Sequence, residues 1–191
     1  MLARITTAVV ALALSTPLFA ADTWEADPGH STIAFRVLHA GVSPFYGLIN
    51  GPTGTIVIDS EDASKSSVNI EAKIANIYTA NPDRDTHLKN DEFFNAMQHP
   101  TVSFKSTAVK KVDDKTFEVT GDLTMHGVTK SMTVKLHKLG ENDKIPQLGH
   151  VAGFETTFTI KRSDFKFGSK FGPEALGEEI TLMVGIEGKK K

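Results

Sequence analysis

Residue types that could do catalytic chemistry lie close together near the start of the chain. Asp27, His30 and Ser31 are the three types that form a hydrolase triad. A triad is recognised by its geometry rather than by adjacency in sequence, and no nucleophile-elbow pattern surrounds Ser31. Asp27 precedes Pro28 and Gly29, where an aspartate accepts hydrogen bonds from its own turn. This stretch therefore predicts no catalytic residue.

A second polar group, formed by Arg84, Asp85 and His87, lies near the middle of the chain. Arg84 and Asp85 allow two interpretations. They form a local ion pair, or the planar guanidinium of Arg84 faces the phosphate or carboxylate head group of a ligand, which it can bind through two parallel hydrogen bonds. Both interpretations stay open, because adjacency in sequence does not fix where a side chain points.

Seven histidines raise the question of a metal site. His30, His39, His87 and His126 all lie near expected turns, so they could meet at one end of a β-fold, and neutral imidazole is a common metal ligand. The sequence has no cysteine, no His-x-x-x-His pair and no carboxylate in register with a histidine pair. His126 also has a simpler role beside Gly127, because histidine tolerates the left-handed backbone of a tight turn. We predict no metal ion and no cofactor.

The elements that must position these residues are mostly strands. In Ser31–His39, the residues Ile33, Phe35 and Val37 fall on one face, which is the period-two pattern of a half-buried strand. Residues 41–54 hold four glycines and two prolines and predict a loop or bulged edge. Other alternating segments lie at residues 55–59, 68–74, 102–106, 117–125, 128–137, 154–160 and 180–186, and His126-Gly127 predicts a hairpin with a primed turn between two of them.

One long segment, Ile77–Pro100, does not alternate. Asp85 and Asp91 could each cap a short helical turn, and the proline at the end of the segment cannot continue a helix. Phe93 and Phe94 form an apolar plug beside the polar group described above. We expect one or two short helices that act as a lid or plug for a β-fold.

These elements predict an all-β fold of about eight or nine antiparallel strands. No βαβ pattern is present, so the architecture is a sandwich or a barrel. The first and last strands are both strongly amphipathic, and pairing them would remove two exposed sheet edges. This favours an antiparallel β-barrel of one domain with a short helical insert.

The first 20 residues match an export signal. Arg4 precedes an apolar run that ends in small residues, and cleavage is expected after Ala20. A membrane anchor is disfavoured, because the run is shorter than the ~20 apolar residues that a spanning helix needs and no basic stop follows it. We therefore predict a mature protein without a stable membrane span, located in a bacterial periplasm, where a chain without cysteine relies on its core for stability.

The charge balance argues against nucleic-acid binding. The chain carries a net charge of −2, which becomes −3 when the segment containing Arg4 is removed. Nucleic-acid binding needs a concentrated basic face, but the basic run Lys189–Lys191 stands alone at the C-terminus. The phenylalanines allow two interpretations, an ordinary packed core or the wall of an apolar ligand pocket.

Several blocks of the sequence, taken together, resemble one protein family. DPGHSTIAFRVLHAG, YTANPDRDTHLKNDEFFN, HPTVSF, GDLTMHGVTK and IKRSDF resemble the YceI-like family of exported lipid-binding proteins. The resemblance covers nearly the whole mature chain, with the domain at residues 22–188. Its recurring positions match here as Asp27, His30, Ser31, Phe35, His39, Gly47, Arg84, Asp85, His87, Leu88, Phe93, Phe94, His126, Gly127 and Arg162.

The resemblance implies a lipocalin-like antiparallel barrel with a long apolar cavity. It implies that the barrel binds a long-chain isoprenoid, a prenyl quinone, or a fatty amide or acid. The polar residues expected at the head group or the mouth are His30, Arg84, Asp85, His87 and Arg162. The residues expected in the cavity wall are Ile33, Phe35, Val37, Ile70, Phe93, Phe94, Phe104, Phe117, Phe154 and Phe158.

The function that this predicts is a periplasmic carrier that sequesters a lipid without transforming it, as a monomer or a homodimer. One alternative is a cavity enzyme acting on a quinone or lipid with His30 or His87 as acid and base. Another is a ligand-free interaction module of the cell envelope. The module predicts a filled core with an exposed apolar patch, whereas the carrier predicts a cavity.

Overall fold

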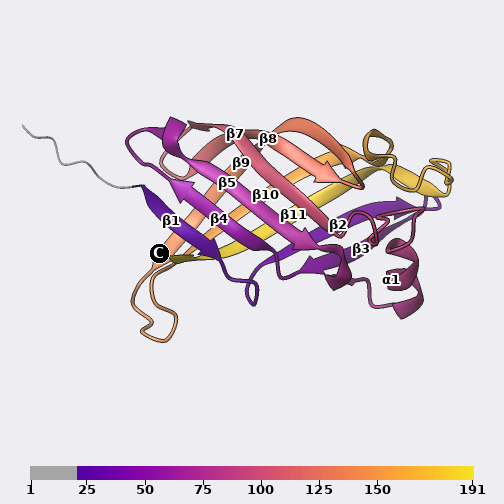
Figure 1. Cartoon of the computed structure of the whole chain (residues 1–191), viewed down its shortest axis with the longest axis horizontal. Coiled ribbons are helices and arrows are strands. Elements are labelled where there is room, and N and C mark those ends of the chain that lie inside the picture. The colour runs from indigo at the N-terminus through magenta and orange to yellow at the C-terminus, as the bar shows by residue number, and fades with distance from the viewer. Residues whose placement is uncertain (1–20) are drawn as a thin grey trace, which may run out of the picture.

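Alternating apolar and polar residues form an antiparallel β-barrel with one α-helix in the computed structural model, which describes residues 21–191 (Figure 1). The predicted signal peptide, residues 1–20, lies outside the described residues. The helical elements are α1 (Pro82–Leu88) and three 3-10 turns, η1 (Ala63–Lys65), η2 (Ile74–Asn76) and η3 (Arg162–Phe165). The strands are β1 (Asp22–Ala26), β2 (Thr32–His39), β3 (Ser43–Asn50), β4 (Thr53–Ile58), β5 (Ser67–Lys73), β6 (Ile77–Tyr78), β7 (Thr101–Lys111), β8 (Thr116–Met125), β9 (Val128–Asn142), β10 (Val151–Lys161) and β11 (Leu176–Lys190).

Six of these strands form three long strands, each interrupted by a break: β1 with β2, β3 with β4, and β5 with β6. β1 and β2 both pair with β11, at Trp24 opposite Lys190 and at Phe35 opposite Leu182. β3 and β4 pair with β2 and β1 in the same way, and β6 and β5 pair with β3 and β4. The chain is thus a closed up-and-down barrel of eight long strands. The predicted pairing of the first and last strands is confirmed, and a sandwich is excluded.

Inward-facing residues form two clusters at successive levels of the barrel axis. In β8 every second residue is buried, from Phe117 to Met125. The cluster at the end that holds β1, β4 and the C-terminus is built around Trp24 and Phe154, and we call this the closed end. The cluster at the end that holds α1 and the tip of the β2–β3 hairpin includes Phe35 and Phe94, and we call this the mouth end.

Two local predictions are wrong. Residues 41–54 predict a loop, but they contain the strand β3 and the start of β4. The glycines Gly41 and Gly51, which have positive φ, flank β3, and Gly47 faces inward within it. A Cβ at Gly47 would collide with the ring of Phe35, so this glycine makes room for a neighbour instead of forming a turn. The single helix is capped by Asn81, whose side chain accepts a hydrogen bond from the Arg84 amide, and not by Asp85 or Asp91.

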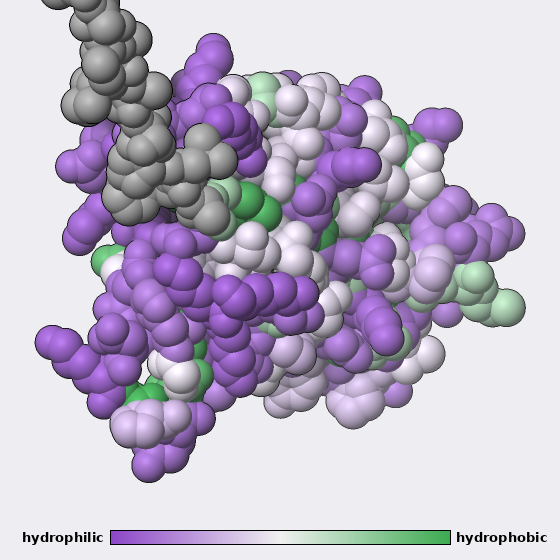
Figure 2. Space-filling view, turned by 60° about the vertical axis from the view of Figure 1, so that its left-hand side comes forward, coloured by the Kyte–Doolittle hydropathy of each residue, from purple (hydrophilic) through white to green (hydrophobic). Residues whose placement is uncertain are grey.

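The β8–β9 hairpin agrees with the sequence. His126 and Gly127 have φ angles of 51° and 72°, which is the left-handed backbone of the predicted primed turn. No helix among residues 21–191 is long and apolar enough to cross a membrane. The face that Figure 2 brings forward is mostly hydrophilic or neutral, with its hydrophobic side chains in small separate areas. The apolar residues of the alternating strands are accordingly turned to the inside.

Candidate ligand-binding cavity

The barrel encloses a cavity of about 800 Å³. It exists because the period of two turns every second side chain of β2, β7, β8, β10 and β11 inward, and these side chains do not fill the space between the strands. The predicted wall residues that border it are Ile33, Phe35, Val37, Ile70, Phe93, Phe94, Phe104 and Phe158.

The other two predicted wall residues, Phe117 and Phe154, do not border the cavity. Both are buried in the cluster at the closed end, with exposed fractions of 2% and 1%. They pack with Trp24 beneath the cavity, where Ile56, Val119 and other members of that cluster form its floor. Period two identifies an inward-facing residue, but it does not say at which level of the barrel the residue lies.

The mouth lies between two segments at the same end of the barrel. The segment after α1 contributes Phe93 and Phe94, and the loop at residues 162–177 contributes Phe167 and Phe171. Phe93 is stacked on Phe171 with ring centroids 5.3 Å apart, and Phe94 contacts Phe167 edge-on at 4.5 Å. These four rings form an aromatic rim. The exposed polar residues that also border the cavity here are His39, Ser43, Tyr46, Arg84 and His87.

Arg84 is positioned at the mouth by contacts with Thr79 and Phe45. Its Nε donates to Thr79 Oγ1 at 3.0 Å and its Nη2 donates to the Thr79 carbonyl at 2.6 Å. Its guanidinium lies 4.2 Å from the centroid of the Phe45 ring. Asp85 is occupied elsewhere, since it accepts from the amide and hydroxyl of Thr79. Arg84 therefore makes no ion pair with Asp85 or with any other carboxylate within residues 21–191, and the local ion-pair interpretation is wrong.

Glu92 connects the two segments of the mouth. Its carboxylate lies 2.8 Å from His87 Nε2 and 2.8 Å from Lys170 Nζ, and its carbonyl accepts from the Gly168 amide at 2.9 Å. We call these contacts the Glu92 latch. The nearby Lys170 ammonium, and after it the His87 ring, hold the pKa of Glu92 below its usual value. The latch fastens the aromatic rim from the outside.

Arg162 lies behind the same loop and does not border the cavity. Its side chain is buried, with 4% exposed, and its guanidinium donates only to backbone carbonyls, apart from Glu178 Oε2 at 3.7 Å. A buried guanidinium that satisfies several carbonyls shapes the loop from within. The structure therefore places Arg162, expected at the head group, in the support of the rim; the carbonyls belong to Phe167, Gly168, Phe171, Leu176 and Gly177.

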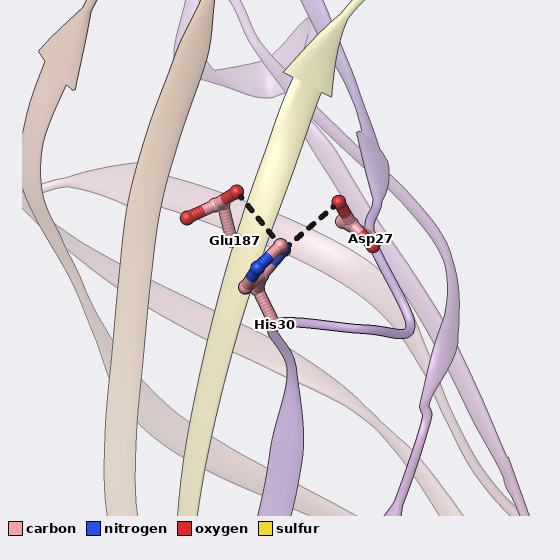
Figure 3. Close-up of side chains that lie close together, drawn as sticks. All are labelled: Asp27, His30 and Glu187. Atoms are coloured by element: carbon pink, nitrogen blue, oxygen red, sulfur yellow. Dashed lines mark hydrogen bonds and ion pairs between the residues drawn. The ribbon is translucent and has the colours of Figure 1, made fainter. Parts of the chain in front are cut away.

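His30 lies far from the mouth, at the break between β1 and β2. Its Nδ1 is 3.1 Å from Asp27 Oδ2 and 3.6 Å from Glu187 Oε1, and Figure 3 shows the ring between the two carboxylates. The ring is 60% exposed and does not border the cavity. Ser31 Oγ binds the backbone of Glu187 rather than His30, so the triad residue types do not form a triad.

Asp27, His30 and Glu187 are the only group of three that could hold a metal ion within residues 21–191, with ligand atoms within 4.8 Å of one another. Lys189 Nζ already lies 2.8 Å from Asp27 Oδ2. The pKa of Asp27 is lowered mainly by Lys189, and to a smaller extent by hydrogen bonds from the Gly29 amide and His30. Asp27 therefore has a protein cation as its partner. The cluster joins the broken strand to β11, and the four histidines considered above do not converge on one site.

Several residues of the mouth are absent from the sequence-based site. The sequence does not identify Phe45 and Tyr46, because the glycines and prolines around them predict a loop where the structure has β3. Phe167 and Phe171 lie in an irregular loop without periodicity, although phenylalanines at positions 165, 167 and 171 of an otherwise polar stretch were a usable signal. His39 closes β2, and the sequence suggests it only as a possible metal ligand and as a recurring family position. Hydrophobic side chains in a loop are expected to pack against an apolar surface, and here Phe167 and Phe171 line the apolar cavity.

A closed antiparallel barrel with an apolar cavity open at one end defines the class of lipocalin-like binding barrels. The chain belongs to the YceI-like domain family, whose model matches residues 24–188. A UPF0312 protein of Photorhabdus laumondii is 39% identical over 165 residues, covering 86% of this chain and 84% of the relative. A UPF0312 protein of Pseudomonas savastanoi is 36% identical over 190 residues, covering 96% and 97%.

Solved structures show the same fold. A YceI protein of Campylobacter jejuni superimposes with a TM-score of 0.70 at 30% identity, over 78% of this chain and 88% of that one. BcnA of Burkholderia cenocepacia gives a TM-score of 0.76 at 18% identity, covering 86% and 99%. A polyisoprenoid-binding domain from Saccharophagus degradans gives 0.65 at 10% identity, covering 88% and 98%. None of these relatives is described as an enzyme.

Proposed function

We propose that this protein is a carrier that holds one long-chain isoprenoid, or a related amphiphilic lipid, in the barrel cavity without transforming it. The observation that carries the proposal is the cavity of about 800 Å³ with an almost entirely apolar lining. An interaction module without a ligand predicts a filled core, which is not what the barrel contains. Burial of an acyl or prenyl chain contributes about 0.8 kcal/mol per CH₂, so a cavity of this kind binds tightly without charged contacts.

The ligand is oriented with its chain toward the floor and its polar head at the mouth. The floor offers mainly aliphatic side chains such as Ile56 and Val119, whereas the mouth offers the guanidinium of Arg84 and the ring of His87. Arg84 has no carboxylate partner within the described chain, so a head group with acceptor oxygens satisfies it. Quinone, carboxyl and amide head groups all meet this requirement.

Two further points support the proposal. A structural neighbour with the same fold is a polyisoprenoid-binding domain. The N-terminal residues 1–20 have the pattern of an export signal, which supports action in the periplasm, where a lipid that moves between membranes needs shielding from water. The enzyme alternative lacks a comparable observation, because His30 does not reach the cavity and His87 is held by Glu92.

The test begins with native mass spectrometry of the mature protein purified from its own periplasm, followed by mass analysis of an organic extract. We expect one stoichiometric long-chain species, whose mass distinguishes prenyl from acyl chemistry. A protein that is free of ligand, and that also resists loading with prenyl quinones and fatty amides, would remove the proposal and favour the interaction module.

A pair of variants tests the location of the ligand. Val184 faces the cavity from β11, and Thr157 faces outward from the adjacent strand β10. Val184→Trp places a bulky ring inside the cavity and should block loading of a long chain, whereas Thr157→Trp adds the same side chain outside and should leave loading unchanged. Equal loading of the two variants would contradict binding inside the barrel.

A further inference from the structure

The outer face of the barrel carries a continuous apolar row beside the mouth. Met183 on β11 is opposite Ala34 on β2, Ala34 is opposite Leu48 on β3, and Leu48 is opposite Tyr78 on β6. Each of these residues alternates with an inward neighbour that is buried or borders the cavity, so all four face outward. Because directly opposite side chains on one face are neighbours, the four form one row across four strands.

More apolar side chains extend this row toward the mouth. Leu38 is opposite Pro44, and Tyr46 follows two residues along the same face of β3. Tyr46 and Tyr78 are 56% and 54% exposed, and Val42, at the tip of the β2–β3 hairpin, is 82% exposed. We call the whole set the mouth-side surface. It consists of Ala34, Leu38, Val42, Pro44, Tyr46, Leu48, Tyr78 and Met183.

The rest of the barrel wall is different in kind. Most outward positions of β9 and β10 hold threonine, serine and charged residues, all of them exposed: Ser131, Thr133, Lys135, Glu155, Thr157, Thr159 and Lys161. The exposed large apolar residues outside the mouth-side surface are Met97, Val112, Leu139 and Ile145. The face brought forward in Figure 2 likewise shows no broad hydrophobic area. The mouth-side surface therefore differs from the mostly polar exterior of β9 and β10, and contiguous exposed and half-buried apolar residues of this kind mark an interaction site.

The surface is continuous with the cavity entrance. Pro44 and Tyr46 belong to the mouth-side surface and also border the cavity, together with Phe45 between them. In Figure 1, β2 and β3 lie at the same end of the molecule as α1. A partner that covers this surface therefore lies next to the entrance.

A positive charge beside the mouth-side surface points to the nature of that partner. Arg36 faces outward on β2, opposite Tyr46 on β3 and Thr181 on β11. No carboxylate pairs with Arg36 within residues 21–191, although the exposed Glu179 lies two residues before Thr181 on the same face of β11. A second copy docked through the same surface would bury two guanidinium groups that have no ion-pair partner, which is costly. Lipid phosphates supply the missing anion.

We propose that the mouth-side surface docks reversibly on the surface of a phospholipid bilayer and so brings the mouth to the membrane. The inference rests on the proposed function, since a lipid carrier must pass an apolar chain between bilayer and cavity, at a cost that grows with each methylene exposed to water. Tyrosine suits this role because its ring prefers the boundary between apolar and hydrated regions. Val42 and Leu48 enter the boundary, and Arg36 faces the phosphates.

Flotation of the mature chain with vesicles tests the docking. We expect binding to vesicles of phosphatidylethanolamine and phosphatidylglycerol. In the double variant Leu48→Glu with Tyr78→Glu, the bound fraction should fall about ten-fold or more, because apolar contact is lost and negative charge is added. Thr157→Glu, outward on β10, should bind like the wild type. Circular dichroism and thermal melting establish that each variant is folded.

Arg36→Gln provides a second, milder variant. It should reduce binding to vesicles that contain phosphatidylglycerol about five-fold, as expected for one basic residue near an anionic surface, and leave binding to pure phosphatidylcholine unchanged. Wild-type protein that binds no vesicles, or a Leu48→Glu, Tyr78→Glu variant that binds as well as wild type, overturns the proposal. A wild-type dimer that this double variant dissociates, without vesicle binding, assigns the surface to a second copy and overturns it as well.

Loading with retinol, a fluorescent isoprenoid alcohol, separates the two proposals. The double variant should still take up retinol added from solution, because its cavity is intact, whereas Val184→Trp should bind vesicles but not retinol. Failure of retinol and other lipids to load the wild type counts against the carrier function. Failure of vesicle binding with normal retinol loading counts against docking alone.

Discussion

The two ends of the barrel are built from the same strands but differ in packing: the closed end is filled with side chains, and the mouth end opens into a cavity. At the closed end Trp24 is fully buried and packs edge-on against Phe154 and His150, with ring centroids 6.2 and 5.1 Å away. At the mouth end the cavity is left open, and the four rings of the aromatic rim come from the insert and a loop rather than from strands. The difference indicates that the closed end holds the barrel together and leaves the other end free to accept a ligand.

The means of support also differ between the ends. The closed end is supported by dispersion and burial of apolar area, which need no directional contacts. The mouth depends on polar groups, namely the carbonyl contacts of Arg162 and the Glu92 latch. Polar groups exchange partners with water more readily than a packed core opens. We therefore expect stability to respond mainly to changes at the closed end, and ligand exchange to changes at the mouth.

Replacement of Trp24 by alanine should have the largest effect. The side chain is fully buried, so the cavity left behind should cost about 3–5 kcal/mol of the free energy of unfolding. Urea unfolding followed by circular dichroism measures it. Trp24→Phe is the matched control. It keeps most of the apolar area and removes an indole N–H that has no hydrogen-bond partner, so its cost should be much smaller. Similar losses in the two variants would contradict packing as the cause.

Arg162→Ala should come next, at about 3 kcal/mol, because it leaves several buried carbonyls without a donor. Unlike Trp24→Ala, which weakens the core of the closed end, Arg162→Ala should destabilise only the segment at residues 162–177. Hydrogen–deuterium exchange should show faster exchange in this loop, together with faster release of a loaded lipid. Uniformly faster exchange over all strands would instead place Arg162 in the support of the whole barrel.

The sequence predicts the fold well because period-two alternation reports directly on which side chains face inward. The faces of β2, β8 and β10 are assigned correctly for this reason, and the closure of the barrel follows from the amphipathic end strands. The strand β3 is missed because its glycines and prolines look like turn residues. Gly47 is explained only by its neighbour across the sheet, Phe35, which a local pattern does not contain.

The candidate site is predicted less completely than the fold. Phe35 and Phe104 are found because strand alternation identifies them, whereas Phe167 and Phe171 depend on how an irregular loop folds back. Polar residues are recognised by type but not by direction. His30 and Arg162 therefore join the expected mouth, although one lies beside Glu187 and the other behind the rim.

Gly47→Ala tests the boundary between wall and cavity and should cost about 1–3 kcal/mol. The added methyl group collides with the ring of Phe35, which must turn toward the cavity or push β3 outward. Lipid loading should fall along with the melting temperature. The double variant Gly47→Ala with Phe35→Leu relieves the collision and should recover much of the stability. If it recovers none, the strain lies in the backbone of β3 rather than in the contact with Phe35.

The Glu92 latch should give the smallest effect on stability and a specific effect on exchange. The folded protein lowers the pKa of Glu92 below the ordinary value of 4.5, so the contribution of the latch is present above that value and is lost as the pH falls through the lowered pKa. Release of a loaded lipid should therefore accelerate below about pH 4.5, while the melting temperature changes little.

Glu92→Gln should release lipid at the fast rate at neutral pH and should lose this acid dependence, because the amide cannot pair with Lys170 as an anion. Lys170→Met removes the same ion pair from the other side and should behave alike. Asp83→Asn, a nearby exposed carboxylate outside the latch, is the matched control and should retain both the slow rate and the acid response. If Glu92→Gln also retains the acid response, a group other than Glu92 controls the rate of lipid release. The contacts that join the insert to the loop would then not determine how fast the lipid exchanges.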